Sequence, residues 1–464
     1  MIVLLCALIS GALFYLSTGI GTVWPLAWLA PVPLLWLAYG RRPVWQVFIA
    51  SFAAFTLGLL NVVQAYGSII FTIAPSLPIV PVLFAASVLF ARFVHRHLPN
   101  VFAVVAFPAL WTGVEYLMAS TSKNGTFGSL AYSQVPAPPL IQSASLFGMW
   151  SVTFLLCMIA SAIALLLVDG RNARAAVAVA AGLFVANLAF GYARLAAAPL
   201  PAVRVGAVTD DAIAFAPDRE SILIAARRYA DLARHLSARG ATTVVLPEKI
   251  GTLGPDWGEV RAVFERVARE THSRVVVGFQ ERGVQDANVA LAFEPNGTVE
   301  RYVKRHLIPH FETLVPGNVA GLMPDGGALE ICKDMDFQAT IRGDARNGVN
   351  IAFVPAWDFV TDREAHANMA IMRGAENGFA VVRSAREGLM TISDSQGRVV
   401  ARAVSSPAGP VTILADVAPG KEGTLYVRIG DVFGWGCLAL AAILGVVCRI
   451  PTRVRATLSP PGRE

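Results

Sequence analysis

The sequence is poor in charged residues. Only 15% of its 464 residues are charged, whereas 55% are hydrophobic. Soluble globular domains carry about a quarter charged residues, so much of the surface of this chain is expected to lie in lipid. The length also leaves room for more than one domain.

Paired cysteines are missing as well. The five cysteines form no CxxC and no paired spacing, which argues against a disulfide framework and against a zinc site. Cys6, Cys157, Cys437 and Cys448 lie in apolar stretches, where a thiol behaves as a small hydrophobic group. Cys332 is therefore the one thiol in the polar part of the chain.

The net charge of +6 does not come from a basic stripe with interleaved aromatic residues, so no nucleic-acid partner is predicted. The first apolar segment lacks a charged n-region and a cleavage site of small residues. We therefore interpret it as a retained membrane helix and not as a signal peptide.

Long apolar runs fill the N-terminal part and recur once near the C-terminus. A helix that crosses a bilayer core of about 30 Å needs roughly 20 apolar residues. The sequence predicts about eight such spans, seven of them within the N-terminal region 1–199 and one within 429–450. The candidate runs are 2–20, 24–40, 45–66, 74–94, 101–119, 144–168, 174–196 and 430–449.

Arginines stand in alternate loops between these runs. Basic residues favour the cytoplasmic side, so both termini and the tail 451–464 are predicted in the cytoplasm, and residues 200–428 outside it. The tail is also expected to be disordered. The arginines are Arg41, Arg42, Arg92, Arg96, Arg171, Arg174, Arg449, Arg453 and Arg455.

Residues 200–428 alternate between strand-like and helix-like segments. Apolar residues recur at helical spacing in 217–239, and 257–271 is predicted as a charged helix, whereas 203–208 and 242–248 have the composition of strands. The segment 288–304 is expected to be a hairpin that turns at Asn296-Gly297. This order predicts a layered α/β domain whose sheets are covered by helices.

Four polar residues of this domain stand at predicted strand ends or in the loops that follow: Glu248, Lys304, Glu312 and Cys332. A cysteine attacks an acyl carbon as thiolate and needs a base, which a carboxylate in a partly dry pocket can provide. A fixed ammonium group stabilises the oxyanion that follows. Taken singly, each residue also has a plain structural interpretation. The glutamates fit a surface or capping role, Lys304 fits a solvent-exposed run of charges, and Cys332 fits a thiol that packs in the core.

The local contexts resemble the nitrilase (carbon–nitrogen hydrolase) superfamily. The residues concerned are Leu-Pro-Glu at 246–248, the Y-x-K-x-x-L-x-P string at 302–309, and a cysteine after a short apolar strand. The spans resemble the apolipoprotein N-acyltransferase family of bacterial envelopes, in FPALWTGVEYLM (107–118), FGSLAYSQ (127–134) and QSASLFGMWSVTFLL (142–156). The resemblance implies a Glu–Lys–Cys triad on an αββα sandwich, attached to a polytopic helical membrane domain.

The resemblance also implies roles for single residues. Glu248 would be the general base, Lys304 the oxyanion stabiliser and Cys332 the nucleophile. Glu312 would orient the lysine or the acceptor amine. The Lys333 backbone N–H would be a further oxyanion donor. Trp357 is a candidate for the wall of the acyl pocket, although a plain packing role fits it equally well.

By this resemblance, Cys332 would take a fatty acyl group from a phospholipid and pass it to the α-amine of a diacylglyceryl-cysteine apolipoprotein. The chain would be a multi-pass protein of the bacterial inner membrane with its catalytic domain on the periplasmic side, in contact with membrane lipid, and would need no metal and no cofactor. A membrane-bound amidase and an acyltransferase with another amine acceptor remain open. A ligand-binding transporter or receptor is disfavoured because the spans are unrepeated and poor in polar residues.

The chain departs from the family pattern beside the thiol. Cys332-Lys333-Asp334 stands where the family has Cys-Tyr-Glu, and VPAWDF (354–359) replaces N-D-A-W-F-G. Lys333 removes an aromatic wall, and a cation there is expected to lower the thiol pKa. These differences are consistent with a divergent branch.

Two further features have competing interpretations. Glu115 lies inside a predicted span, where a carboxylate is functional by default, although a hydrogen-bonded anchor is nearly as plausible. His366, Arg373, Glu376 and Asn377 share one predicted helix, which we expect to support the site from below.

Overall fold

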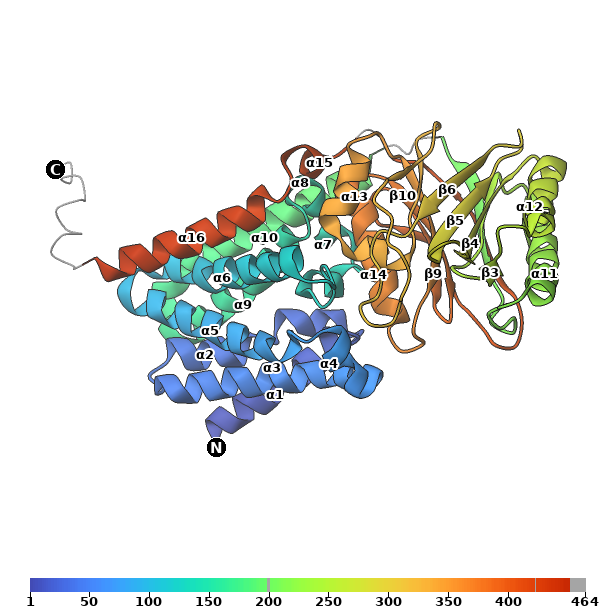
Figure 1. Ribbon diagram of the computed structural model, residues 1–464. Coiled ribbons are helices and arrows are strands. Elements are labelled where there is room, and N and C mark those ends of the chain that lie inside the picture. The colour runs from blue at the N-terminus through green and yellow to red at the C-terminus, as the bar shows by residue number, and fades with distance from the viewer. Residues whose placement is uncertain (198–200, 422, 451–464) are drawn as a thin grey trace.

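The computed structural model describes residues 1–197, 201–421 and 423–450. The predicted tail 451–464, with Arg453 and Arg455, and the predicted domain boundary at 199/200 lie outside these residues. A bundle of long helices and an α/β domain lie next to each other, and the chain enters and leaves the α/β domain from the bundle (Figure 1).

Among the described residues, five helical segments are long and apolar enough to cross a membrane: Val44–Ile73, Leu77–His97, Asn100–Thr121, Trp150–Leu195 and Val432–Arg449. The fourth consists of α9 (Trp150–Asp169) and α10 (Arg174–Leu195), which pack against each other. Two shorter apolar segments, Ile2–Ser17 and Trp24–Tyr39, precede them. Each predicted run contains helix, while the exact number of spans stays a prediction.

The second predicted span is not one continuous helix. It consists of a 3-10 helix, η1 (Trp24–Trp28), and a helix of eight residues, α2 (Val32–Tyr39). Pro25, Pro31 and Pro33 explain the interruption, because proline has no N–H to donate and its ring clashes with the preceding turn. The predicted candidate span over 24–40 is thus helical in two pieces, and whether it crosses the membrane stays a prediction.

The remaining long helices of the bundle pack around one apolar core, which contains Phe84, Phe107 and Trp111. Their bounds are α1 (Ile2–Ser17), α3 (Val44–Tyr66), α5 (Val80–His97), α6 (Asn100–Thr121) and α16 (Val432–Arg449). A short helix, α4 (Ile70–Ile73), follows α3 on the side of the α/β domain (Figure 1).

Two β-sheets form the centre of the α/β domain. The first has the order β13-β1-β2-β4-β5-β6, with β3 beside β4, and the second has the order β12-β11-β10-β9-β8-β7. The first sheet contains β1 (Val203–Thr209), β2 (Thr243–Val245), β3 (Thr252–Leu253), β4 (Arg274–Glu281), β5 (Ala287–Phe293), β6 (Val299–Val303) and β13 (Val411–Val417). The second contains β7 (Gly321–Leu322), β8 (Gly327–Leu329), β9 (Ile351–Trp357), β10 (Ala380–Arg386), β11 (Leu389–Ser393) and β12 (Val399–Val404).

Helices cover both outer faces, so the layers follow the predicted αββα order. Helices α11 (Arg219–Ala238) and α12 (Gly258–Thr271) cover the first sheet on the far side from the bundle (Figure 1). Helices α13 (Gln338–Ala345) and α14 (Arg363–Asn377) cover the second sheet and face the bundle. Apolar side chains of both sheets, among them Val276 and Phe353, form the core between them.

The predicted hairpin is present as β5 and β6, and Gly297 has the positive φ of 90° that its turn requires. Strand β13 was not predicted. Its apolar residues do not alternate cleanly, and it is recognised only by its antiparallel pairing with β1 at the edge of the first sheet.

Helix α14 joins the α/β domain to the bundle. Met369 and Met372 of this helix pack with Ala131 and Trp150 of the bundle in one apolar cluster. The buried Arg373 donates to the Tyr132 hydroxyl at 2.9 Å. This interface places the edge of the α/β domain that carries Cys332 next to the helices of the bundle.

Candidate active site

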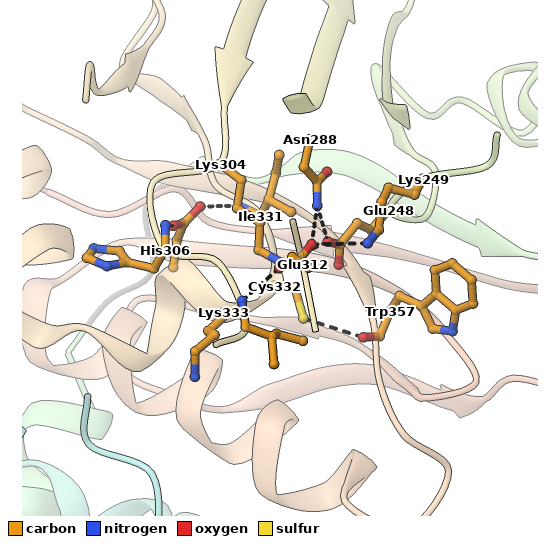
Figure 2. A network of polar contacts seen from close by, with 12 residues as sticks. Glu248, Lys249, Asn288, Lys304, His306, Glu312, Ile331, Cys332, Lys333 and Trp357 are labelled. Carbon is orange, nitrogen blue, oxygen red and sulfur yellow. Dashed lines mark hydrogen bonds and ion pairs between the residues drawn. The ribbon is translucent and has the colours of Figure 1, made fainter. Parts of the chain in front are cut away.

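The four predicted catalytic residues come together at one end of the two sheets (Figure 2). Glu248 lies in the loop after β2, Lys304 directly follows β6, and Cys332 comes shortly after β8. Because β2 is parallel to its neighbours in the first sheet, as β8 is to β9 in the second, the carboxyl ends of strands from both sheets meet here. Such ends are where α/β folds place their sites.

The Lys304 ammonium is the centre of the cluster. Its Nζ lies 2.9 Å from Glu248 Oε1 and 2.9 Å from Glu312 Oε2, and the residue is only 1% exposed. Burial opposes the charge of Lys304, but the two carboxylates outweigh it and raise the lysine pKa well above its usual range. The lysine is therefore a permanent cation.

Two residues that sequence reasoning missed complete this cluster. Asn288 donates from Nδ2 to Glu248 Oε1 at 2.6 Å and to Glu312 Oε1 at 3.0 Å. Lys249 donates from Nζ to Glu312 Oε1 at 3.0 Å. The one sequence signal for Lys249 is its position next to Glu248. Asn288 has no such signal, because its local pattern is that of any polar residue in a strand.

Glu312 is held as an anion. Burial raises its pKa, but Lys304 and Lys249 outweigh burial and lower the pKa to about 2, and the Ile308 backbone N–H donates to the same carboxylate at 2.9 Å. A carboxylate with so low a pKa is a poor proton acceptor at neutral pH. Its contacts suit a group that holds Lys304 in place.

Cys332 begins a 3-10 helix, η6 (Cys332–Asp336). Its φ is +41°, in the left-handed region that residues with a side chain rarely adopt. Strained backbone of this kind often accompanies functional groups. The sulfur lies 3.6 Å from the Trp357 carbonyl oxygen.

Asp334 holds this strained turn against the segment that carries Lys304. Its carboxylate accepts from the backbone N–H of Ile331 at 3.1 Å, of Arg305 at 3.1 Å and of His306 at 2.8 Å. Tyr302 donates its hydroxyl to the same group at 2.7 Å. The contacts explain how two distant parts of the chain keep a fixed spacing between the thiol and the lysine.

The thiol of Cys332 is a neutral group at rest. Burial raises its pKa well above the usual value, Glu248 raises it further, and Lys304 lowers it. Only a thiolate attacks an acyl carbon readily, so a nearby base must remove the proton when the substrate is in place.

The expectation that Lys333 lowers the thiol pKa was wrong. The Lys333 side chain points away from the sulfur (Figure 2), and its Nζ lies 3.2 Å from Asn124 Oδ1 and 3.3 Å from Asp336 Oδ2. The side chains of neighbouring residues leave the backbone in different directions. The Lys333 ammonium and the Cys332 thiol are therefore apart although the residues are adjacent in sequence.

Trp357 forms part of a cavity with Cys332, at the boundary between the α/β domain and the bundle. Its indole Nε1 donates to Glu387 at 3.2 Å, and the Arg386 guanidinium lies 4.4 Å from the centre of a Trp357 ring. The cavity is mostly apolar, and α3 and α4 provide one wall. Its lining consists of Tyr66, Ile70, Ile73, Ala74, Asn124, Phe127, Ile308, Cys332, Lys333, Asp336, Trp357, Phe359 and His366.

Glu115 does not join this cluster. Its carboxylate is buried within the bundle and accepts hydrogen bonds from Trp111, Ser129, Thr153 and the Leu130 backbone N–H. The contacts match the interpretation of Glu115 as an anchor, because they tie the loop after α6 to two helices.

The comparisons with known proteins agree with the resemblance read from the sequence. Residues 10–162 match the family described as apolipoprotein N-acyltransferase N-terminal domain. A protein of Geobacter metallireducens named apolipoprotein N-acyltransferase is 28% identical over 96% of this chain and 94% of its own length. One of the same name from Bradyrhizobium diazoefficiens is 27% identical over 76% of this chain and 75% of its own. The resemblance to apolipoprotein N-acyltransferases is thereby confirmed.

Solved structures similar to the chain include nitrilase-superfamily proteins. Nit3 of Saccharomyces cerevisiae is 17% identical, with a TM-score of 0.41, over 56% of this chain and 99% of its own. An amidase from Nesterenkonia sp. is 16% identical, with a TM-score of 0.40, over 51% of this chain and 97% of its own.

Proposed function

Because the chain is a homologue of the apolipoprotein N-acyltransferases, we propose that it transfers a fatty acyl group from a phospholipid to the N-terminal amine of a diacylglyceryl-cysteine lipoprotein. The observation that carries the proposal is the buried cluster in which Lys304 contacts Glu248 and Glu312 beside the thiol of Cys332. The cavity of Cys332 also borders the helices of the bundle, from which a lipid ester can approach.

In the first step, the Cys332 sulfur bonds to the carbonyl carbon of a phospholipid ester. Glu248 takes the thiol proton and returns it to the leaving glycerol oxygen, so that a lysophospholipid departs and a thioester remains. Lys304, fixed by its two carboxylates, stabilises the oxyanion of the tetrahedral intermediate, and the Lys333 backbone N–H is a second donor.

In the second step, the lipoprotein amine attacks the thioester carbonyl. Glu248 accepts a proton from the amine and returns it to the sulfur, which restores the thiol and leaves an amide on the lipoprotein. Glu312 keeps Lys304 in position through both steps. None of these steps requires a metal or an organic cofactor.

We propose that the bundle spans the bacterial inner membrane and that the α/β domain, bounded approximately by residues 200 and 428, lies on the periplasmic side. The acyl chains of both substrates would then stay in the bilayer while their reactive groups reach Cys332.

The test is the acyl state of Cys332 in the full-length protein reconstituted with phospholipid. Mass spectrometry should detect a fatty acyl thioester on the peptide that contains Cys332, and Cys332→Ala should abolish it. Cys437→Ala is the matched control, because this thiol is buried in α16 away from the site, and the variant should form the thioester normally. Absence of any adduct in the unmodified protein would contradict the proposal.

A second measurement separates acyl transfer from hydrolysis. A synthetic diacylglyceryl-cysteine peptide with a free α-amine should discharge the thioester and gain the acyl group as an amide. The same peptide with a blocked α-amine should not. Discharge by water alone at the same rate would instead support a membrane-bound amidase, and discharge by other amines would support a different acceptor.

A further inference from the structure

The side chain of Lys333 has no role in the triad chemistry. The residue is only 6% exposed, and it lines the same cavity as Cys332. A buried ammonium is costly unless opposite charge compensates for it. A bound ligand that carries negative charge would stabilise an ammonium in this position.

Lys333 shares its ionic partner with a second cationic side chain. Its ionic partner is Asp336, at 3.3 Å, and this carboxylate is shared with the His366 imidazole, whose Nδ1 lies 3.8 Å away. A second carboxylate, Asp362, contacts His366 Nε2 at 3.1 Å and also accepts from the Tyr66 hydroxyl. Asp362 does not line the cavity, so the described lining carries two cationic groups and one carboxylate.

The His366 imidazole carries a positive charge at neutral pH. Burial opposes the charge on His366, but Asp362 and Asp336 outweigh it and raise the His366 pKa to about 10. The pKa of Asp336 is lowered, since Lys333 and His366 outweigh its burial. Asp362 balances His366 from behind the lining, so Asp336 is the one carboxylate that lines the cavity beside Lys333 among the described residues.

The hydrogen bonds of Lys333 are also long enough to be exchanged. They measure 3.2 Å to the neutral Asn124 amide oxygen and 3.3 Å to Asp336, whereas charge-assisted N–H···O bonds are usually about 2.7–2.9 Å. An ammonium has three protons to donate. An anionic oxygen could therefore replace the Asn124 contact at little cost.

The rest of the cavity wall is apolar and comes largely from the bundle. Ile70, Ile73 and Phe127 stand on this side, and Asn124 donates from Nδ2 to the Ile73 carbonyl at 3.0 Å. The ammonium thus lies between an apolar wall suited to acyl chains and the turn that carries the thiol. In a glycerophospholipid, the phosphate is likewise a few bonds away from the reactive ester.

We propose that Lys333, with His366, forms a subsite for the phosphate diester of the lipid donor, and that Lys333 is the residue that favours phospholipids over phosphate-free acyl donors. This inference rests on the proposed function and deepens it, since it assigns the anionic part of the donor to a side chain that the triad does not use. In this role the side chain binds substrate while the neighbouring Cys332 reacts.

The experiment compares two donors with the full-length protein in detergent micelles. One is a diacyl phosphatidylglycerol, and the other is the p-nitrophenyl ester of the same fatty acid, which carries no phosphate. The rate of thioester formation on Cys332 is measured against donor concentration. With phosphatidylglycerol, Lys333→Met should raise the half-saturating concentration about 10-fold to 100-fold, the usual effect of losing a hydrogen bond to a charged group.

The same variant should lose much less with the p-nitrophenyl ester than with phosphatidylglycerol, because only phosphatidylglycerol carries a phosphate, and Lys333→Arg should restore most of the use of phosphatidylglycerol. Lys123→Met is the matched control, because Lys123 is an exposed lysine on the same loop as Asn124, and it should change neither reaction. Thermal unfolding of each variant checks that the fold is retained.

Two outcomes would overturn the inference. Equal losses with both donors would mean that Lys333 only supports the turn, and no loss with phosphatidylglycerol would mean that the phosphate is bound elsewhere. Failure of the proposed function is distinguishable, because the unmodified protein would then form no thioester with phosphatidylglycerol.

Discussion

Lys249 Nζ lies 3.0 Å from Glu312 Oε1, so the second glutamate of the site is shared between two lysines. The contact ties the loop that carries the proposed general base to the segment after β6. It also means that the charge on Glu312 depends on a residue outside the Glu–Lys–Cys triad.

Removing Lys249 should change how the reaction depends on pH. Lys304 and Lys249 both contribute to the low pKa of Glu312, which is about 2, so Glu312 stays ionised in mildly acidic solution. In Lys249→Met, the pKa of Glu312 should rise by about one unit or more. The acidic limb of thioester formation should move to higher pH by a similar amount, whereas Lys249→Arg should behave as the unmodified protein. An unchanged limb would mean that Lys249 does not control Glu312.

The Glu248→Gln variant should separate the reactivity of the thiol from catalysis. Glu248 raises the Cys332 pKa, so its neutralisation should lower that pKa and speed alkylation of Cys332 by iodoacetamide at pH 8. Thioester formation from phospholipid should fall by about 100-fold or more, because the proposed base is gone. Peptide mass spectrometry measures both reactions in the same sample. Slower alkylation, or a parallel change in both rates, would argue against this division of roles.

His366 should make stability depend on pH in the alkaline range. Its pKa is raised to about 10, so the charged imidazole stabilises the fold fully below its unfolded value of about 6.5, and this contribution is lost as the pH rises towards 10. The melting temperature in detergent should therefore fall between pH 6.5 and 10, and the fall should be smaller in His366→Gln. The exposed His235 offers a control, since His235→Gln should leave the pH profile unchanged. Identical slopes for all three proteins would contradict the prediction.

Glu115 should contribute to stability through the hydrogen bonds it accepts inside the bundle. In Glu115→Leu, the hydroxyls of Ser129 and Thr153 lose a buried partner, at a cost of about 1–3 kcal/mol for each unsatisfied group. Glu115→Gln keeps one acceptor oxygen and should lose less. Thermal unfolding in detergent measures the difference, and limited proteolysis in the 122–134 loop should accelerate in the same order. Equal stability of the leucine variant and the unmodified protein would exclude the anchoring role.

Much of the architecture could be predicted because it depends on local composition. Apolar runs identified the helices of the bundle, and amphipathic spacing identified α11 and α12 almost to their ends. The proline-rich second run was the exception, since three prolines interrupt what its hydropathy alone suggests. Strand β13 was missed because its pairing with β1, which lies some 200 residues earlier, leaves little local trace.

For the site, the sequence alone determined which residues are candidates, because Glu248, Lys304 and Cys332 each stand in a short context with its own spacing. Only the tertiary structure decided which other side chains contact these residues. Asn288 of β5 and Lys249 of the loop after β2 both contact Glu312, and Lys333 turns away from the thiol towards Asp336 and Asn124. The direction of a buried side chain depends on the packing and charges of the surrounding segments, which are distant in sequence. The residues next to it in the sequence therefore do not determine that direction.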